Sequence, residues 1–280
     1  MSGGVQVSAG GSAGVAAGER WWPRNVQRGL LGATGVLGLI ALWQVAASLS
    51  GVSPYFFPSP RDVAGAFAVL IDRGILPVDV ADSLGRYLAG VGLGTAVGLT
   101  LGLALGVSRS AARVLGPLLN FLYAIVEVAW IPIFVIWWGY GLRVILVALT
   151  YVVAFPVLFN TATAVRATPR VLIDVVRALG ASRRQVLTEV IVPAALPGII
   201  TGFRVGAGFA FRGLIFAEMI GAKDGVGYLI LTSAANHATD RTMAGMIVVG
   251  TLWLLIDQLY LRPFERVTIE RWGLVRNVQE

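Results

Sequence analysis

The segment that decides the fold is RATPRVLIDVVRALGASRRQVLTEVIVP, residues 166–193, which lies between two long apolar runs. It is rich in arginine and contains two short amphipathic patterns, one on each side of Gly180. Thr168 opens the first pattern, and a glycine at 180 suits the left-handed residue that follows a helix C-terminus. Ser182 begins the second pattern with a capping box, and we expect Pro193 to end it. The segment therefore predicts a helix, a glycine corner and a second helix.

The apolar runs around this segment indicate a membrane protein. The 280 residues are 56% hydrophobic and 13% charged, with a mean hydropathy of +0.78, whereas about a quarter of an ordinary soluble domain is charged. A helix needs about 20 mainly apolar residues to cross the hydrocarbon. Pro132 and Pro156 are expected to kink or break their helices. We predict an all-α polytopic membrane protein with about six transmembrane helices, at residues 29–49, 84–107, 117–138, 142–165, 194–220 and 243–261.

Two shorter apolar stretches do not reach this length. Residues 63–71 predict a surface helix, because Ser59, Pro60 and Asp62 stand where an N-cap, a first-turn proline and a first-turn acid are favoured. Residues 226–231 lie inside a polar loop and predict a re-entrant or interfacial segment.

The two ends of the chain predict tails. Residues 1–28 begin with a stretch rich in Gly, Ala, Ser and Val that has no periodicity, which is typical of a disordered tail. The run 29–49 has a secretory signal as its alternative, but it is longer than an h-region of about 7 to 15 residues. We interpret it as a retained span. The transmembrane domain is then 29–262, and 263–280 is a C-terminal tail.

The arginine distribution predicts the orientation, because basic loops stay on the cytoplasmic side of a membrane. With the N-terminus inside, the cytoplasmic segments hold Arg20, Arg24, Arg28, Arg109, Arg113, Arg166, Arg170, Arg177, Arg183, Arg184, Arg262, Arg266, Arg271 and Arg276. The opposite side holds only Arg61, Arg73, Arg143, Lys223 and Arg241. Both termini are therefore expected to be cytoplasmic. In so apolar a chain, the net charge of +7 fits the cytoplasmic lipid surface better than nucleic acid.

The composition argues against several kinds of catalytic site. The absence of cysteine excludes disulfides, thiolate metal sites and a cysteine nucleophile, and a lone His237 argues against a histidine metal site. Lys223 is the only lysine, and its neighbours do not form the phosphate-binding pattern G-x-x-x-x-G-K-[ST]. We expect no catalytic residue, metal or bound cofactor in this chain, so any ATP must be hydrolysed by another polypeptide.

Glycine ladders predict close helix packing. Glycine recurs at every fourth position in the span 84–107, so one helical face is bare backbone. The span 194–220 repeats the pattern. The partner of each ladder is either another helix of this chain or a second copy of it. The ladder residues are Gly90, Gly94, Gly98, Gly102 and Gly106, then Gly198, Gly202, Gly206 and Ala210.

Candidate pathway residues lie in the span 117–138. An intramembrane carboxylate is costly unless it meets a partner or a watery cavity, so Glu127 is a functional candidate. The alternative is a structural pair with Arg204 or Arg212, for which Glu218 competes. In a continuous helix, Glu127 shares one stripe with Asn120, Tyr123 and Trp130.

One part of the chain resembles a known family. Residues 174–197, DVVRALGASRRQVLTEVIVPAALP, resemble the EAA loop in permease subunits of binding-protein-dependent ABC importers. The resemblance is closest to the branch that imports sulfonates, taurine, nitrate or bicarbonate, and related heterocyclic nutrients. Matches extend over about 42–262 and include FFPSP (56–60), AWIP (129–132), WWGYG (137–141), FP (155–156), NT (160–161), AEM (217–219) with Gly221, and GVGYLI (225–230).

The resemblance implies a type I ABC importer permease fold in a bacterial cytoplasmic (inner) membrane. It also implies a homodimer, two separate cytoplasmic ABC ATPase subunits that use ATP and Mg, and an extracytoplasmic solute-binding protein. Asp174-Val-Val stands where the family name expects Glu-Ala-Ala, so a contact specific to glutamate is not carried over. The ATPase-coupling positions carried over are Asp174, Arg177, Ala178, Leu179, Gly180, Ala181 and Ser182.

The leading functional hypothesis is the membrane subunit of an ATP-driven importer for a small anion. Arg204 and Arg212 suit an anion, whereas an ionised Glu127 opposes one, which leaves a neutral or nitrogenous nutrient, such as a pyrimidine or vitamin precursor, as an alternative. Two alternatives come from other classes. One is a proton-coupled secondary carrier that uses Glu127. The other is an intramembrane enzyme that uses Glu127, Asn120 or Asn160 with an arginine, but it lacks a convincing acid, base and nucleophile.

Overall fold

The structure is a computed structural model that describes residues 24–261 and 263, with side chains from Thr34 onward. The predicted tails lie outside these residues, apart from 24–28 and 263, which are helical. Helix α1 (Arg24–Leu49) belongs to one compact unit, and the chain from Val52 onward forms another. The described apolar part of α1, Thr34–Leu49, is shorter than a membrane crossing.

Four helical runs in the described residues are long and apolar enough to cross a membrane. They are α3 (Ile75–Val107), α6 (Leu142–Ala167), Arg183–Gly221 with α9 (Val192–Gly221), and Thr239–Leu261 with α11 (Thr239–Ile256) and η3 (Asp257–Leu261). A fifth arises if α4 (Arg109–Ala124) and the segment Glu127–Trp138 form one broken span. Five of the six predicted spans therefore have a counterpart. The first is represented only by the shorter described part of α1.

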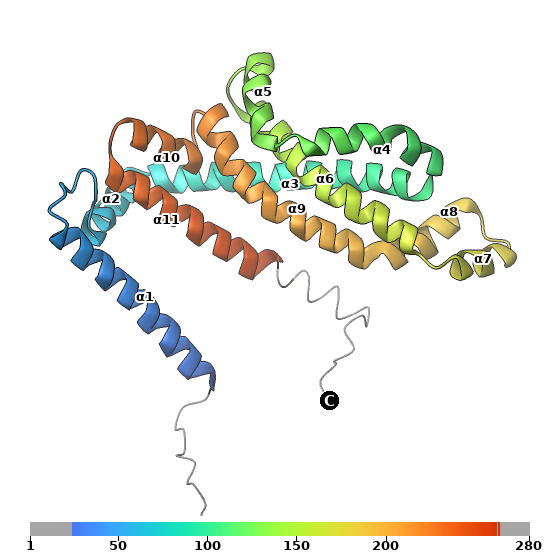
Figure 1. Cartoon of the computed structure of the whole chain (residues 1–280), viewed down its shortest axis with the longest axis horizontal. Coiled ribbons are helices and arrows are strands. Elements are labelled where there is room, and N and C mark those ends of the chain that lie inside the picture. Colours follow the sequence, from blue (N-terminus) through green and yellow to red (C-terminus); the bar gives the residue numbers. More distant parts are fainter. Residues whose placement is uncertain (1–23, 262, 264–280) are drawn as a thin grey trace, which may run out of the picture. The chain divides into compact units, whose positions relative to one another are not determined.

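The centre of the larger unit is α6, which packs between α3 and α9 (Figure 1). All five ladder glycines of α3 face α6, and a Cβ added at any of them would lie 2.5–2.6 Å from an α6 atom. Gly198, Gly202 and Gly206 of α9 face α6 in the same way. The ladders therefore pack within the chain, as one of the two open alternatives predicted. Three of the α6 side chains that meet these glycines, Leu149, Val153 and Val157, are fully buried.

We expect Gly98→Ala to loosen this packing. The added Cβ would lie 2.5 Å from the Ala154 carbonyl oxygen and 2.7 Å from Val157 Cβ, so the backbones must separate. Overpacking of this kind costs about 1–3 kcal/mol. Gly92→Ala is the matched control, because its Cβ would meet nothing within 4 Å on the same helix. Thermal unfolding in detergent should give a lower Tm for Gly98→Ala only, and equal Tm values would contradict this packing.

The third predicted span is broken rather than continuous. Helix α4 ends at Ala124, Ile125 and Val126 are extended, and the chain resumes as η1 (Glu127–Trp130) and α5 (Ile131–Trp138), bent by 89° from α4. Pro132 in the first turn of α5 has no N–H to continue an upstream helix, so the break was expected near it. The single stripe from Asn120 to Trp130 was therefore wrong, because the helix that would align it is interrupted.

A side chain of α6 holds the break in place. The Tyr151 hydroxyl donates to the Leu122 carbonyl oxygen, which also accepts a hydrogen bond from the Ile125 N–H at the end of α4. The same hydroxyl lies 3.1 Å from Trp130 Nε1 and accepts its hydrogen bond. Helix α6 itself runs through Pro156 without a break, and Asn160 Nδ2 donates to the Pro156 carbonyl at 2.9 Å.

Short helices lie at both ends of α3. Figure 1 shows α2 (Pro60–Asp72) and α10 (Val226–Ala235) toward one end and α7 (Arg170–Ala178) and α8 (Arg183–Gln185) beyond the other. The predicted cap of α2 is confirmed as a Ser59–Asp62 capping box. The hydrogen bonds from Ser59 hold the pKa of Asp62 below its ordinary value. The segment 226–231, predicted to be re-entrant or interfacial, belongs to α10, which packs on α9 and α11.

Candidate coupling loop and pathway cavities

The glycine corner predicted at Gly180 is confirmed. Gly180 has φ +86°, its N–H donates to the Arg177 carbonyl at 3.0 Å, and the Ala181 N–H donates to the Val176 carbonyl at 3.2 Å. This pair of bonds is a Schellman motif, which satisfies the last carbonyls of α7. Ser182 then caps α8 through the predicted capping box with Gln185. We call residues 170–182 the coupling loop.

One face of the coupling loop is apolar and uncovered. Leu179 is 82% exposed at the glycine corner, although leucine is among the residues most often buried. The opposite face packs inward, because Ile173 contacts a cluster that contains Val165 and Ile191. An exposed apolar patch beyond the membrane-spanning helices marks an interaction site. The other uncovered side chains of this face are Val171, Leu172 and Val175.

The second helix of the corner does not end at Pro193, which corrects the prediction. Helix α8 continues through the π-helical turn η2 (Val186–Ile191) into α9. Pro193 occupies the first turn of α9, where a missing N–H is tolerated, and the wide π turn accommodates the change of register. The coupling loop is therefore joined to the membrane-crossing helix α9 by unbroken helix.

A buried polar cluster, which we call the outer lock, joins α3, α9 and the start of α10. The Glu218 carboxylate is fully buried. Arg86 Nη1 lies 3.0 Å from Glu218 Oε1, Ser83 Oγ lies 2.8 Å from the same oxygen, and the Gly227 N–H donates to Oε2 at 3.0 Å. Arg86 also pairs with the exposed Asp224 carboxylate. Glu218 was expected to compete for Arg204 or Arg212, but Arg86 is its partner.

Two glycines of the outer lock leave no room for a side chain. A Cβ at Gly225, whose φ is +100°, would lie 2.5 Å from Glu218 Oε1, and a Cβ at Gly227 would lie 2.6 Å from the Ile215 carbonyl oxygen. The Gly225 N–H donates to Asp79 Oδ1 at 2.9 Å. The motif GVGYLI thus brings the backbone of α10 against buried carboxylates. Sequence reasoning missed Arg86 and Asp79, although charges of both signs within apolar helices signal a pair.

Glu127 lines a cavity of about 190 Å³ between the broken span, α6 and α9. Aromatic rings line it: Phe155 packs edge to face against Tyr151 and at a tilt against Tyr123. Asn120 and Trp130 do not line this cavity. Of the predicted stripe, only Tyr123 and Glu127 therefore meet at one place.

Arg204 and Arg212 line a different cavity, of about 440 Å³, together with Asp257 and Trp253. Among the described residues, neither arginine forms an ion pair with Glu127. The two cavities share Phe209 of α9 as a common lining residue. The structure therefore places Glu127 and the two arginines in neighbouring spaces, and the Asp257 carboxylate shares the space of the arginines.

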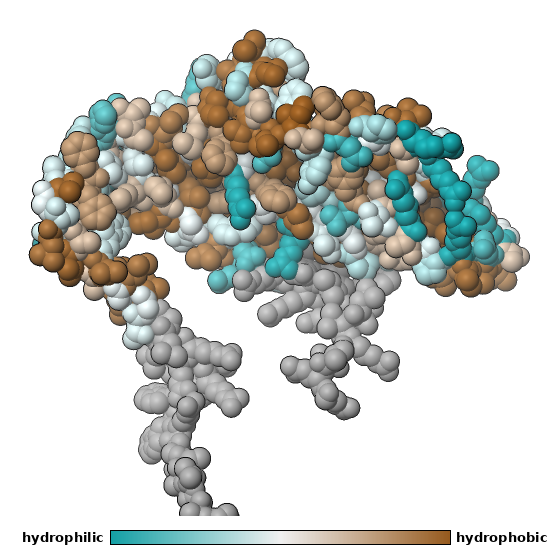
Figure 2. Space-filling view, in the orientation of Figure 1, coloured by the Kyte–Doolittle hydropathy of each residue, from teal (hydrophilic) through white to brown (hydrophobic). Residues whose placement is uncertain are grey.

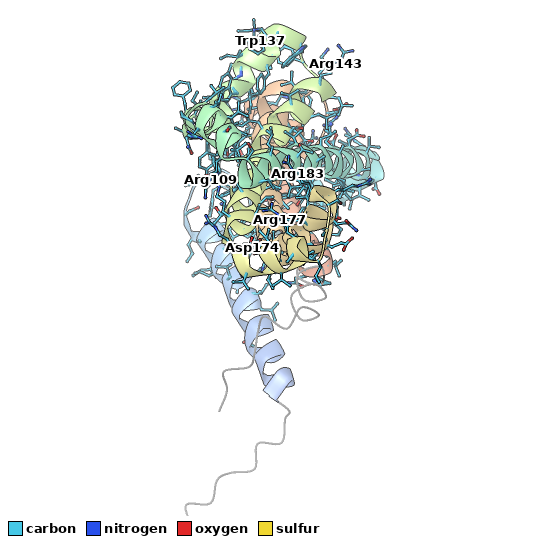
Figure 3. The ribbon with its side chains drawn as sticks, turned by 90° about the vertical axis from the view of Figure 1, so that its right-hand side faces the viewer. Arg109, Trp137, Arg143, Asp174, Arg177 and Arg183 are labelled. Carbon is cyan, nitrogen blue, oxygen red and sulfur yellow. The ribbon has the colours of Figure 1, made fainter. Side chains whose placement is uncertain are left out.

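The ends of the molecule differ in character. Figure 2 shows hydrophilic side chains gathered toward the end that holds α7 and α8, and hydrophobic ones over much of the helices between the ends. Figure 3 shows Asp174 and Arg177 of the coupling loop, Arg183 of α8 and Arg109 at the end that faces the viewer, away from Trp137 and Arg143.

Comparison with known proteins agrees with this architecture. Residues 94–262 match the family model described as "Binding-protein-dependent transport system inner membrane component". The putative aliphatic sulfonates transport permease protein SsuC of Bacillus subtilis (strain 168) is 34% identical over 230 residues, which are 81% of this chain and 82% of the relative. The riboflavin transport system permease protein RibX of Chloroflexus aurantiacus is also 34% identical, over 84% of this chain and 87% of the relative. In fold, the chain resembles a chain of the inward-facing MetNI methionine ABC transporter, with a TM-score of 0.61, 22% identity and coverage of 70% of this chain and 97% of that chain.

Proposed function

The chain belongs to the family of binding-protein-dependent transport system inner membrane components and is the permease subunit of an ABC importer; from this premise we propose how it works with its partners. Two copies of the chain form the translocation unit in a bacterial cytoplasmic membrane, with both termini on the cytoplasmic side. Each copy binds one ATPase subunit at its coupling loop. An extracytoplasmic binding protein delivers solute to the opposite side, where the outer lock lies.

The observation that carries this proposal is the uncovered apolar face of the coupling loop. Leu179 and its neighbours on α7 are exposed in the chain by itself, so they need a protein partner. The chain supplies no phosphate-binding lysine loop of its own, because Lys223 stands between Ala222 and Asp224. A separate ATPase that uses ATP and Mg therefore provides the energy, and the helix through η2 conveys its movement to α9.

The solute passes along the cavities that Glu127 and the two arginines line. Arg204 and Arg212 outnumber the single carboxylate of Asp257 in one space, which favours a small anion such as the aliphatic sulfonates named for the Bacillus relative. The aromatic cavity around Glu127 favours the alternative, a neutral or nitrogenous nutrient, and the riboflavin relative is equally similar in sequence. We favour the anion, because the cavity lined by Arg204 and Arg212 is larger than the one lined by Glu127.

The test is gentle purification of the chain from its native membrane, followed by mass spectrometry of the proteins that accompany it. We expect an ATPase with a phosphate-binding loop, together with a solute-binding protein. The chain reconstituted alone should not accumulate solute. Uptake by the chain alone in a proton gradient, lost in Glu127→Gln, would instead establish the secondary carrier.

A further inference from the structure

A large basic cavity lies beside the coupling loop, where α3 and α6 end. Its volume is about 930 Å³, and it is lined by α4, the end of α6 and α7. Among the described residues, none of its arginines forms an ion pair, and the only carboxylate in the lining is that of Asp174. Figure 3 shows Arg109 and Arg177 at the same end of the molecule. We call this space the arginine cavity, after Arg109, Arg113, Arg166, Arg170 and Arg177.

Backbone groups add to the positive charge of the arginine cavity. Helix α4 begins at Arg109 and α7 begins at Arg170, so both helices turn their N-terminal ends toward it. Free N–H groups and the helix dipole favour an anion at such an end. One arginine is partly used within the chain, since Arg166 Nη2 donates to the Leu105 carbonyl at 3.0 Å.

A buried hydroxyl without a partner provides independent evidence for a ligand. Thr168 lines the arginine cavity and is 7% exposed, and its Oγ1 has no hydrogen-bond partner. Buried polar groups are almost always hydrogen-bonded, and an unsatisfied one is costly. A ligand oxygen in the cavity would accept a hydrogen bond from this hydroxyl and several more from the guanidinium groups.

We propose that the arginine cavity binds a phosphate group, supplied by an anionic phospholipid headgroup or by a free phosphate. Guanidinium groups recognise phosphate oxygens through charge-assisted and often bidentate hydrogen bonds. The lining also includes apolar side chains, Val107 and Val165 at the ends of two spans and Ile173 of α7. Basic pockets at the ends of membrane helices bind acidic lipid headgroups.

The bound phosphate joins α4 to the coupling loop, because Arg109 and Arg113 belong to α4 whereas Arg170 and Arg177 belong to α7. Occupancy therefore restrains the loop that the ATPase contacts, and this consequence rests on the proposed function. Binding itself does not, so the experiment measures binding.

The experiment uses the full-length permease with whatever subunits co-purify with it, reconstituted in phosphatidylcholine nanodiscs with or without phosphatidylglycerol. Native mass spectrometry of the released complex reports retained phosphatidylglycerol. We expect Arg109→Gln/Arg113→Gln to bind it about thirtyfold more weakly, at about 1 kcal/mol for each arginine. The matched control is Arg183→Gln/Arg184→Gln, which removes the same charge from α8 outside the cavity and should retain the lipid.

A second variant keeps the charge unchanged. Thr168→Val preserves the side-chain volume and removes only the unpartnered hydroxyl, so phosphate binding should weaken about tenfold. A separate arm titrates inorganic phosphate into the lipid-free complex, and binding there that depends on Arg109 and Arg113 identifies the free phosphate as a ligand. Equal lipid loss in the two arginine double variants would overturn the proposal, as would cross-links that place acidic ATPase side chains in the cavity. Absence of binding in both arms would do the same.

Discussion

Arg86→Ala is expected to destabilise the protein by about 3–5 kcal/mol, because it leaves the Glu218 carboxylate buried without a cation. Glu218 is fully enclosed, and its remaining partners, Ser83 and the Gly227 N–H, are neutral donors. The same residues attach the start of α10 to α3 and α9. The loss should therefore separate these elements where they meet.

Two further variants distinguish the contribution of the buried Arg86–Glu218 pair from that of the exposed Arg86–Asp224 pair. Asp224 also pairs with Arg86, but its side chain is 55% exposed. Exposed pairs contribute about 0.2–1 kcal/mol, so Asp224→Asn should be nearly neutral. Arg86→Gln/Glu218→Gln removes both charges and should be more stable than Arg86→Ala.

Reversible unfolding by denaturant in detergent, followed by tryptophan fluorescence, measures these differences for all the variants. The expected order of stability is wild type, Asp224→Asn, the double glutamine variant and then Arg86→Ala. The stabilising role of the buried Arg86–Glu218 pair would be contradicted if Asp224→Asn were as destabilising as Arg86→Ala. It would also be contradicted if the double glutamine variant were no more stable than Arg86→Ala.

The outer lock illustrates what could not be predicted from the sequence. Residues 75–83 carry Asp79 and Asp82 and were excluded from the predicted span, although they form the start of α3. The pairing of Arg86 with Glu218 joins positions 132 residues apart, and no local pattern specifies it. The apolar runs did place both partners within predicted spans, Arg86 in 84–107 and Glu218 in 194–220.

Local signals were more informative. The caps at Ser59 and Ser182 and the corner at Gly180 depend on neighbouring residues only, and all three were predicted. The glycine ladders predicted close packing but left the partner open, because bare backbone accepts any helix of matching shape. A kink or break was expected at Pro132, but not that α4 already ends at Ala124. The end of α4 is stabilised by a hydrogen bond from Tyr151 of another helix, and the residue pattern within one span cannot predict such a contact.

The largest effect on transport is expected from Leu179→Asp in the coupling loop. This side chain is 82% exposed at the corner, so the substitution should leave the fold of the chain intact. A central apolar anchor of a protein interface contributes about 2 kcal/mol or more, and a charge in its place adds a desolvation cost. We expect ATPase binding to weaken at least thirtyfold, which is the equivalent of about 2 kcal/mol, and solute-stimulated ATP hydrolysis to be lost.

Thr188→Asp is the matched control for this charge, because Thr188 is exposed in η2, outside the coupling loop. Gly180→Asn is a second control, since asparagine adopts the left-handed conformation more readily than other side chains and the space around Gly180 is open. Gly180→Val, which is strained at φ +86°, should lose coupling while Gly180→Asn keeps part of it. Pull-down of the ATPase and solute-stimulated ATP hydrolysis, measured on variants with equal Tm, test whether the coupling loop binds the ATPase. If Leu179→Asp retained ATPase binding and solute-stimulated ATP hydrolysis, the exposed apolar face of the coupling loop would not be the ATPase contact. The unbroken helix through η2 would then not convey ATPase movement to α9.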